Sequence, residues 1–331
     1  MTDIVAPNGI PVSICVIGTA NLERSLEFYR DLHGMDASKP VAWSGLAFET
    51  HWHLPKGSSA TAVLLHAGPD PVGRILLLDF HAKQRELIRG RNVVGRSYGL
   101  FNINFYTADI WGDYRRFRDK GYEFWSEPVQ HEFNGNVGAP IEVVFEGPDT
   151  VLVNWVELAA TDPKQRIGQM RAFVDQYGRT RTGFTPVVTT ASVMRDITRS
   201  RTFYQRVFDM GIHIDQVLES EGYRRFQKVP PGGRTHVTFM QGNHMFGKIA
   251  TSQPLNYDIP DVVPLAVAPN IGYIAQSFLV PDMAETERRC KAMAVEVYSP
   301  RMDIEIPGLG MRHAMIVRNP GSGCLQQVIQ A

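Results

Sequence analysis

A six-residue motif occurs twice in this chain, with its copies about half the chain apart. Residues 24–29 read Arg-Ser-Leu-Glu-Phe-Tyr, and residues 199–204 read Arg-Ser-Arg-Thr-Phe-Tyr. Each copy follows a run with β-strand character, at residues 12–17 and 186–193, and each has apolar residues at helical spacing. Because an internal repeat marks a fold built from copies of one unit, the chain is predicted to contain duplicated strand–helix–strand units.

Two weaker copies of the same unit complete the pattern. Residues 101–106 alternate like a strand, and Asp109 can cap the helix that follows. In the last copy a strand is expected over residues 274–280, with Asp282 as the helix cap. After each of the four helices the sequence becomes β-like with turns. The sequence therefore predicts an α+β fold of four βαβββ modules.

This order of elements resembles the vicinal oxygen chelate superfamily, which includes glyoxalases, bleomycin-resistance proteins and type I extradiol dioxygenases. The resemblance rests on the Asp or Asn cap, the Arg-Ser-x-x-Phe-Tyr helix, and a Pro-containing turn before the last strand, at residues 147–149 and 319–321. It covers nearly the whole chain. It implies two barrel-like domains, with modules one and two in residues 1–160 and modules three and four in residues 183–331, joined by a helix-containing linker at 161–182.

The resemblance also implies where a metal ion would be held. In metal-dependent members, the first and last strands of two modules supply His or Glu ligands to a divalent cation. Here the corresponding positions carry hydroxyl, amide or apolar side chains: Ser13 or Ile14, Asn102, Asn154, Thr189, Ala275 or Gln276, and Gln326. Because these groups are poor ligands for a transition metal, neither a metal nor another cofactor is expected.

A histidine pair offers a different candidate metal site. His51 and His53 alternate in the segment Glu49-Thr-His-Trp-His, so on a strand both imidazoles would lie on one face. The alternative is an exposed strand end with ordinary polar residues, since a histidine pair alone is a weak motif.

Histidine, amide, hydroxyl and arginine side chains are the candidates for chemistry. His236 and His313 lie in predicted third strands and are candidate acid–base residues, because imidazole titrates near neutral pH. The alternative for each is a hydrogen-bonded barrel histidine. The candidate ligand-binding residues are Thr189, Gln276, Gln326, Arg225, Asn102, Asn104 and Asn154. Since the C-terminal cup would contain the titratable groups, the working pocket is predicted there.

Charge and cysteine content restrict the partners and the compartment. The 34 basic and 34 acidic residues give a formal net charge of zero, so neither nucleic acid nor an anionic membrane surface is an expected partner. No apolar run approaches the roughly 18 residues of a membrane span. The three cysteines are odd in number and scattered, which favours a reducing compartment and hence the cytoplasm.

These observations favour a metal-independent small-molecule enzyme. Aromatic residues near the predicted cups suit an aromatic or polycyclic metabolite, and acid–base chemistry would make the protein a lyase, isomerase or hydrolase. Two alternatives stay open, a non-catalytic metabolite- or drug-binding (resistance) protein and an extradiol-type ring-cleaving dioxygenase with displaced metal ligands. The expected partners are a small-molecule ligand and, as a candidate, a second copy of the chain in a homodimer.

Overall fold

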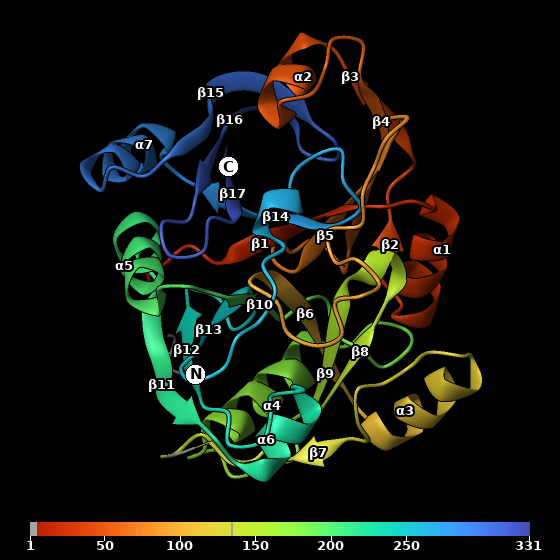
Figure 1. The fold of residues 1–331 in the computed structure, drawn as a ribbon, viewed down its shortest axis with the longest axis vertical. Helices are drawn as coiled ribbons and strands as arrows, with labels where there is room; N and C mark the ends of the chain where they lie inside the picture. The colour runs from red at the N-terminus through yellow and green to blue at the C-terminus, as the bar shows by residue number, and fades with distance from the viewer. Residues whose placement is uncertain (1–4, 134) are drawn as a thin grey trace.

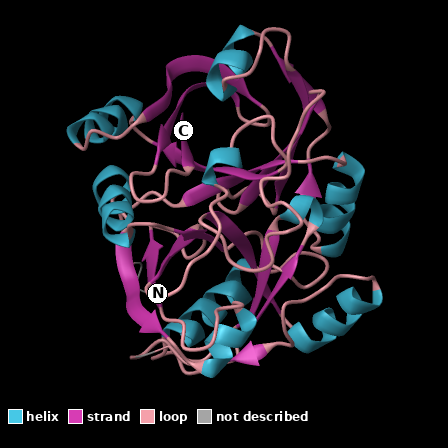
Figure 2. Cartoon of the chain, in the orientation of Figure 1, coloured by secondary structure: helices cyan, strands magenta, loops and turns pink. Residues whose placement is uncertain are grey.

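Two curled β-sheets form the centre of the molecule, as seen in a computed structural model that describes residues 5–133 and 135–331. The two sheets lie one above the other along the long axis (Figure 1). Most of the helices lie at the periphery of the strands (Figure 2). The predicted α+β fold of four βαβββ modules, paired into two barrel-like units, is confirmed.

All four modules contain the predicted βαβββ order, to which modules one and three add a helix between later strands and module one adds a short strand. Module one contains β1 (Val12–Gly18), α1 (Leu22–Leu26), the π-helix η1 (Glu27–Leu32), β2 (Asp36–Ala37), β3 (Val41–Ser44), α2 (Leu46–Trp52), β4 (Ser59–His66) and β5 (Arg74–Phe80). Module two contains β6 (Gly99–Thr107), α3 (Ile110–Asp119), β7 (Val129–Gln130), β8 (Ile141–Glu146), the 3-10 helix η2 (Pro148–Thr150) and β9 (Leu152–Glu157). Module three, which follows helix α4 (Arg166–Tyr177), contains β10 (Thr189–Val193), α5 (Ile197–Phe208), β11 (Gly211–Leu218), α6 (Glu221–Phe226), β12 (Thr235–Gln241) and β13 (Lys248–Pro254). Module four, which follows the 3-10 helix η3 (Val263–Leu265), contains β14 (Gly272–Val280), α7 (Met283–Ala292), β15 (Val297–Ile306), β16 (Gly310–Arg318) and β17 (Leu325–Gln330).

The helix after each first strand begins at an Asn or Asp cap. The side chains of Asn21, Asp109, Asp196 and Asp282 each accept a hydrogen bond from the backbone N–H three residues further on, at 2.9–3.0 Å. Such a cap satisfies one of the backbone donors that a helix leaves free at its start, and it typically contributes about 1 kcal/mol. The caps at Asp109 and Asp282 were both predicted.

The modules pair in an order that the sequence did not predict. Within every module the first strand is parallel to the last one, as in β1 with β5 and β6 with β9. Between modules, the first strands pair antiparallel, β1 with β14 and β6 with β10. One sheet therefore combines modules one and four, and the other combines modules two and three.

The predicted assignment of residues 1–160 to one barrel and 183–331 to another was therefore wrong. Every module has a similar strand edge that is open to pairing. The sequence repeat does not indicate which of these edges pair, because the pairing depends on how the whole chain packs. Modules adjacent in sequence still share a core. Phe28 of η1 packs with Phe117 of α3, and Phe208 of α5 stacks on Phe278 of β14, with ring centroids 6.1 Å and 3.9 Å apart.

Helix α4 lies within the segment predicted as a linker with a helix. It does more than join two halves of the chain, because its residues Ile167, Met170 and Val174 are buried against the sheet of modules two and three. There they pack with Tyr106 and Val156. The helix thus forms part of the wall of that sheet's concave side.

Candidate functional site

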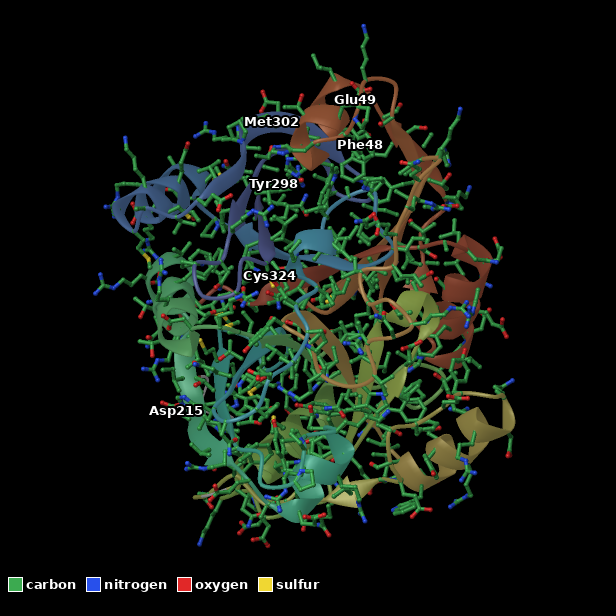
Figure 3. The ribbon with its side chains drawn as sticks, in the orientation of Figure 1. Phe48, Glu49, Asp215, Tyr298, Met302 and Cys324 are labelled. Carbon is green, nitrogen blue, oxygen red and sulfur yellow. The ribbon has the colours of Figure 1, made fainter. Side chains whose placement is uncertain are left out.

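Each sheet curls around a concave side, and the two concave sides, called cups below, differ in their contents. The cup of modules one and four is filled by apolar side chains from its strands and by Phe48 and Trp52 of α2, both buried. Figure 3 labels Phe48 on the inner side of α2 and Glu49 on the outer side. This cup is therefore a hydrophobic core.

The histidine pair lies at the end of α2, so the expectation of a strand at residues 49–53 was wrong. His51 is buried, and its Nε2 lies 2.9 Å from the amide nitrogen of Gln327. His53 adopts a left-handed conformation that ends the helix, and its ring stacks on Tyr298. The two imidazoles therefore have different environments and do not form a shared metal site.

The cup of modules two and three encloses a cavity of about 90 Å³. Its walls are mainly apolar and aromatic, with rings from Phe101, Phe133, Tyr223, Phe226 and Phe239. Because one water molecule needs roughly 10–15 Å³ by this kind of measure, the cavity has room for several waters or a compact organic molecule. It is the candidate functional site.

A row of four polar residues crosses the floor of this cavity. Asn154 of β9 is opposite Asn104 of β6, Asn104 is opposite Thr189 of β10, and Thr189 is opposite Lys248 of β13. All four are buried and line the cavity. They lie on the first and last strands of modules two and three. In metal-dependent members of the superfamily that the sequence resembles, these strands carry the metal ligands.

These residues do not fit a transition metal. Two amides and a hydroxyl are weak ligands, and a protonated Lys248 would repel a divalent cation in the same space. Within residues 5–133 and 135–331, no group of three or more His, Cys, Asp or Glu side chains is placed to hold a metal ion.

Lys248 is the residue that the sequence analysis missed. Its ammonium nitrogen donates to the backbone oxygen of Met245 and lies 5.5 Å from the centre of the Tyr106 ring. Burial, together with the nearby positive charge of Arg166, lowers the pKa of Lys248 to about 7. No local pattern marks Lys248, because it begins the half-polar strand β13 and its burial depends on the tertiary structure.

A buried carboxylate faces the same cavity. Glu142 of β8 accepts a hydrogen bond from the side-chain nitrogen of Asn154 at 2.7 Å, and its other oxygen lies 3.0 Å from Nε2 of His131. The His131 ring stacks on Phe226. The carboxylate is therefore held in place by two partners, and each of its oxygens retains a lone pair for a ligand.

Several buried polar atoms around the cavity have no hydrogen-bond partner within the described protein. They include Oδ1 of Asn102, Asn104 and Asn154, and Nδ1 of His131 and His213. Burial, together with the charge of Lys248, lowers the pKa of His213 well below its usual value, so this imidazole stays neutral. Because buried polar groups are normally hydrogen-bonded, this cluster is suited to bind a polar ligand group or water.

An arginine also lines the cavity, but it is Arg96 and not Arg225. Its terminal nitrogens donate to Oε1 of Gln227 and Oγ of Ser252, both at 2.5 Å, and its guanidinium lies over the Phe101 ring. Arg225 is exposed on α6. The predicted role of Arg225 in ligand binding therefore has no support from its position.

The structure brings four of the predicted binding residues together in this cavity: Asn102, Asn104, Asn154 and Thr189. Gln276 and Gln326, which were predicted to share a cup with Thr189, lie on the other face of their strands. There the hydroxyl of Tyr204 donates to both side-chain oxygens, at 3.2 and 3.4 Å. Strands β14 and β17 belong to the sheet of modules one and four, so neither residue would share a cup with Thr189 in any register. The predicted register also placed them on the wrong face of their strands.

The predicted placement of His236 and His313 in a cup was also wrong. His236 is on the outer face of β12, where its Nε2 lies 2.6 Å from Oδ1 of Asp215, a residue at the periphery in Figure 3. His313 of β16 is half-buried and pairs with Asp303. Both histidines are on strand faces opposite to the ones that line the cups, so neither can reach the cavity.

Comparisons with known proteins agree with the class of protein that the fold and the cup indicate. The model of the Glyoxalase/Bleomycin resistance protein/Dioxygenase superfamily matches residues 12–154. Among curated protein sequences none is significantly similar to the chain. A crystal structure of glyoxalase I from Zea mays is similar, with a TM-score of 0.60 and 12% identity over 97% of this chain and 92% of that one.

A second similar structure is a putative dioxygenase from Bacillus subtilis. Its TM-score is 0.57 at 11% identity, over 98% of this chain and 86% of that one. Residues 12–154 therefore match the model of the glyoxalase, bleomycin-resistance and dioxygenase superfamily, and the two structures show a similar fold over nearly the whole chain. The resemblance inferred from the sequence is confirmed. None of the described helices is long and apolar enough to cross a membrane.

Proposed function

We propose that this chain is a small-molecule enzyme whose working site is the cup of modules two and three, and that this site acts without a transition metal. The observation that carries the proposal is the buried row Asn154, Asn104, Thr189 and Lys248. It lies on the strands that supply metal ligands elsewhere in the superfamily, and it presents hydrogen-bond donors and a lysine in their place.

The cavity favours a compact ligand with an apolar or aromatic body and one oxygen-bearing end. The aromatic walls would contact the body, since stacked and edge-on ring contacts add to the effect of apolar burial. The oxygen would point toward Lys248 and the amides of the row. A cavity of about 90 Å³ favours a single ring over a polycyclic ligand.

Acid–base chemistry in this cup would use Glu142. Its carboxylate would remove a proton from a carbon next to a ligand carbonyl, and the negative oxygen formed would be stabilised by Lys248 and the amide donors. Return of the proton at another carbon gives an isomer, and loss of a leaving group gives a lyase product. This assigns the acid–base role to Glu142 in place of His236 and His313.

Binding of benzoate tests the site, because benzoate has one ring and one anionic oxygen group. Titration calorimetry of the full chain should show one site. Asn104→Leu should weaken binding by about tenfold or more, since it removes one hydrogen bond to a charged group. Gln326→Leu is the matched control, because it removes a buried amide that faces away from the cavity. Equal effects of the two substitutions would refute the placement of the site.

Turnover separates an enzyme from a metabolite-binding protein. Once a ligand that is converted has been found, Glu142→Gln should lower kcat by about 100-fold or more while changing benzoate affinity little. Gln can still bond to Asn154 and His131 but cannot accept the proton. Full activity of this variant would contradict the acid–base role of Glu142.

A further inference from the structure

Resting on the proposed small-molecule site, we propose that Lys248 is a nucleophile that condenses with the carbonyl carbon of an aldehyde or ketone ligand to form an imine. In the proposed function Lys248 acts only through its charge. Here the ligand is an aldehyde or a ketone, and Lys248 holds it in a covalent intermediate.

The surroundings of Lys248 are unusual for a structural lysine. Lys248 is 2% exposed, and among the described residues it has no ion-pair partner. Its nitrogen donates to one backbone oxygen, that of Met245, and otherwise lies near an aromatic ring. A buried ammonium is normally paired with a carboxylate, because its desolvation is otherwise costly. An unpaired lysine that lines a cavity is therefore better suited to reaction than to holding the fold together.

The same surroundings keep the amine reactive near neutral pH. Burial and the charge of Arg166 hold the pKa of Lys248 at about 7, so a large fraction is neutral there, with its nitrogen lone pair free. An exposed lysine is almost entirely protonated at that pH. Desolvation thus provides the activation that a lysine nucleophile requires.

The residues next to Lys248 supply the remaining groups that imine formation needs. Thr189 and Asn104 are the next two residues of the row, and their hydroxyl and amide can donate to the carbonyl oxygen. His213 lines the same cavity and stays neutral, with an Nδ1 that has no partner within the described protein. A neutral imidazole can accept a proton at one nitrogen and release one at the other.

The condensation requires neither an oxidant nor a cofactor. The Lys248 lone pair forms the C–N bond, the carbonyl π pair moves to oxygen, and a proton passes from nitrogen to that oxygen through His213. The resulting hydroxyl leaves as water with the remaining proton of the nitrogen, which also passes through His213, while the C=N bond forms. The overall change is amine plus carbonyl to imine plus water. When protonated, the imine withdraws electrons from the adjacent carbon, which assists removal of a proton by Glu142.

Reductive trapping with benzaldehyde tests this proposal on the full chain. The protein is incubated with benzaldehyde and sodium cyanoborohydride at about pH 7, and peptides are mapped by mass spectrometry. Lys248 should gain one benzyl group on the order of 10- to 100-fold faster than any exposed lysine, because far more of it is neutral at that pH. Added benzoate should slow this labelling selectively.

Two variants complete the experiment. Lys248→Met should abolish the selective label, and its folding can be verified independently by its unfolding curve. Lys228→Met is the matched control, because Lys228 is an exposed lysine over the Trp125 ring, and it should leave the labelling of Lys248 unchanged.

The outcomes separate this proposal from the proposed function. If benzoate binds in the cup but Lys248 is labelled no faster than exposed lysines, the imine proposal is overturned and the binding site stands. If benzoate does not bind and labelling is spread over the surface, both proposals fail. Selective labelling of Lys248 that benzoate suppresses supports both.

Discussion

Replacing Lys248 by Met should stabilise the protein, and the gain should depend on pH. Met has nearly the shape of the lysine side chain but no charge, so the substitution removes the penalty of burying an ammonium group. The substitution also removes the hydrogen bond that Lys248 donates to the backbone oxygen of Met245, and this loss reduces the gain in stability.

The magnitude follows from the pKa of Lys248. Folding lowers this pKa from 10.5 to about 7, and each unit corresponds to about 1.4 kcal/mol. Below pH 7 the buried ammonium thus costs about 5 kcal/mol as an upper bound. The unpaired Met245 oxygen in the variant costs about 1–3 kcal/mol. Lys248→Met should therefore be more stable than the parent protein by roughly 2–4 kcal/mol at about pH 6.

The pH dependence provides the sharper measurement. Because the folded pKa lies below the unfolded one, the unfolded chain binds more protons between about pH 7 and 10.5, and the stability of the parent protein rises with pH in this window. In Lys248→Met this contribution is absent. The charged or titratable groups around Lys248, Arg166, His213 and Glu142, are the same in both proteins.

Urea unfolding at about pH 6 and about pH 9.5 measures the effect. The advantage of Lys248→Met should shrink by about 3 kcal/mol between the two conditions. A difference in unfolding free energy that does not change with pH would show that Lys248 titrates normally. A variant that is less stable at both pH values would show that the lysine supports the fold, and both results would refute the reasoning.

Two further predictions concern the cup of modules one and four and the outer histidines. Trp52→Ala should lower the free energy of unfolding by about 3–5 kcal/mol, because it leaves a cavity in the apolar core of that cup. Its benzoate affinity, measured by calorimetry, should equal that of the parent protein. A weaker affinity would contradict the separation of the two cups. His236→Ala and His313→Ala should each change stability by less than about 1 kcal/mol and leave benzoate binding intact, since both face outward; a loss of binding in either variant would contradict their position.

Local patterns predicted the modules well because they depend on nearby residues. The repeated helix motif and the caps at Asp109 and Asp282 are properties of short segments, and the four βαβββ units follow from them. The segment around His51 and His53 shows where local patterns fail. Its alternation suits a strand, but burial of Phe48 and Trp52 inside the cup stabilises a helix, and tertiary packing outweighs weak propensity.

The candidate site was predicted in part, through Asn102, Asn104, Asn154 and Thr189. Gln276 and Gln326 were placed on the wrong face, because an alternating strand with apolar residues on both sides does not define its register. Lys248 was not predicted as a site residue. Only its burial separates it from an ordinary surface lysine.

By itself, the amino-acid sequence determined the repeating unit, its four copies and the superfamily they resemble. The tertiary structure alone decided which modules share a sheet, which cup is filled and which is hollow. The reason is that these depend on contacts between distant segments: β6 meets β10, and α2 fills the other cup. The same contacts bring Asn104 and Asn154 from one half of the chain beside Thr189 and Lys248 from the other.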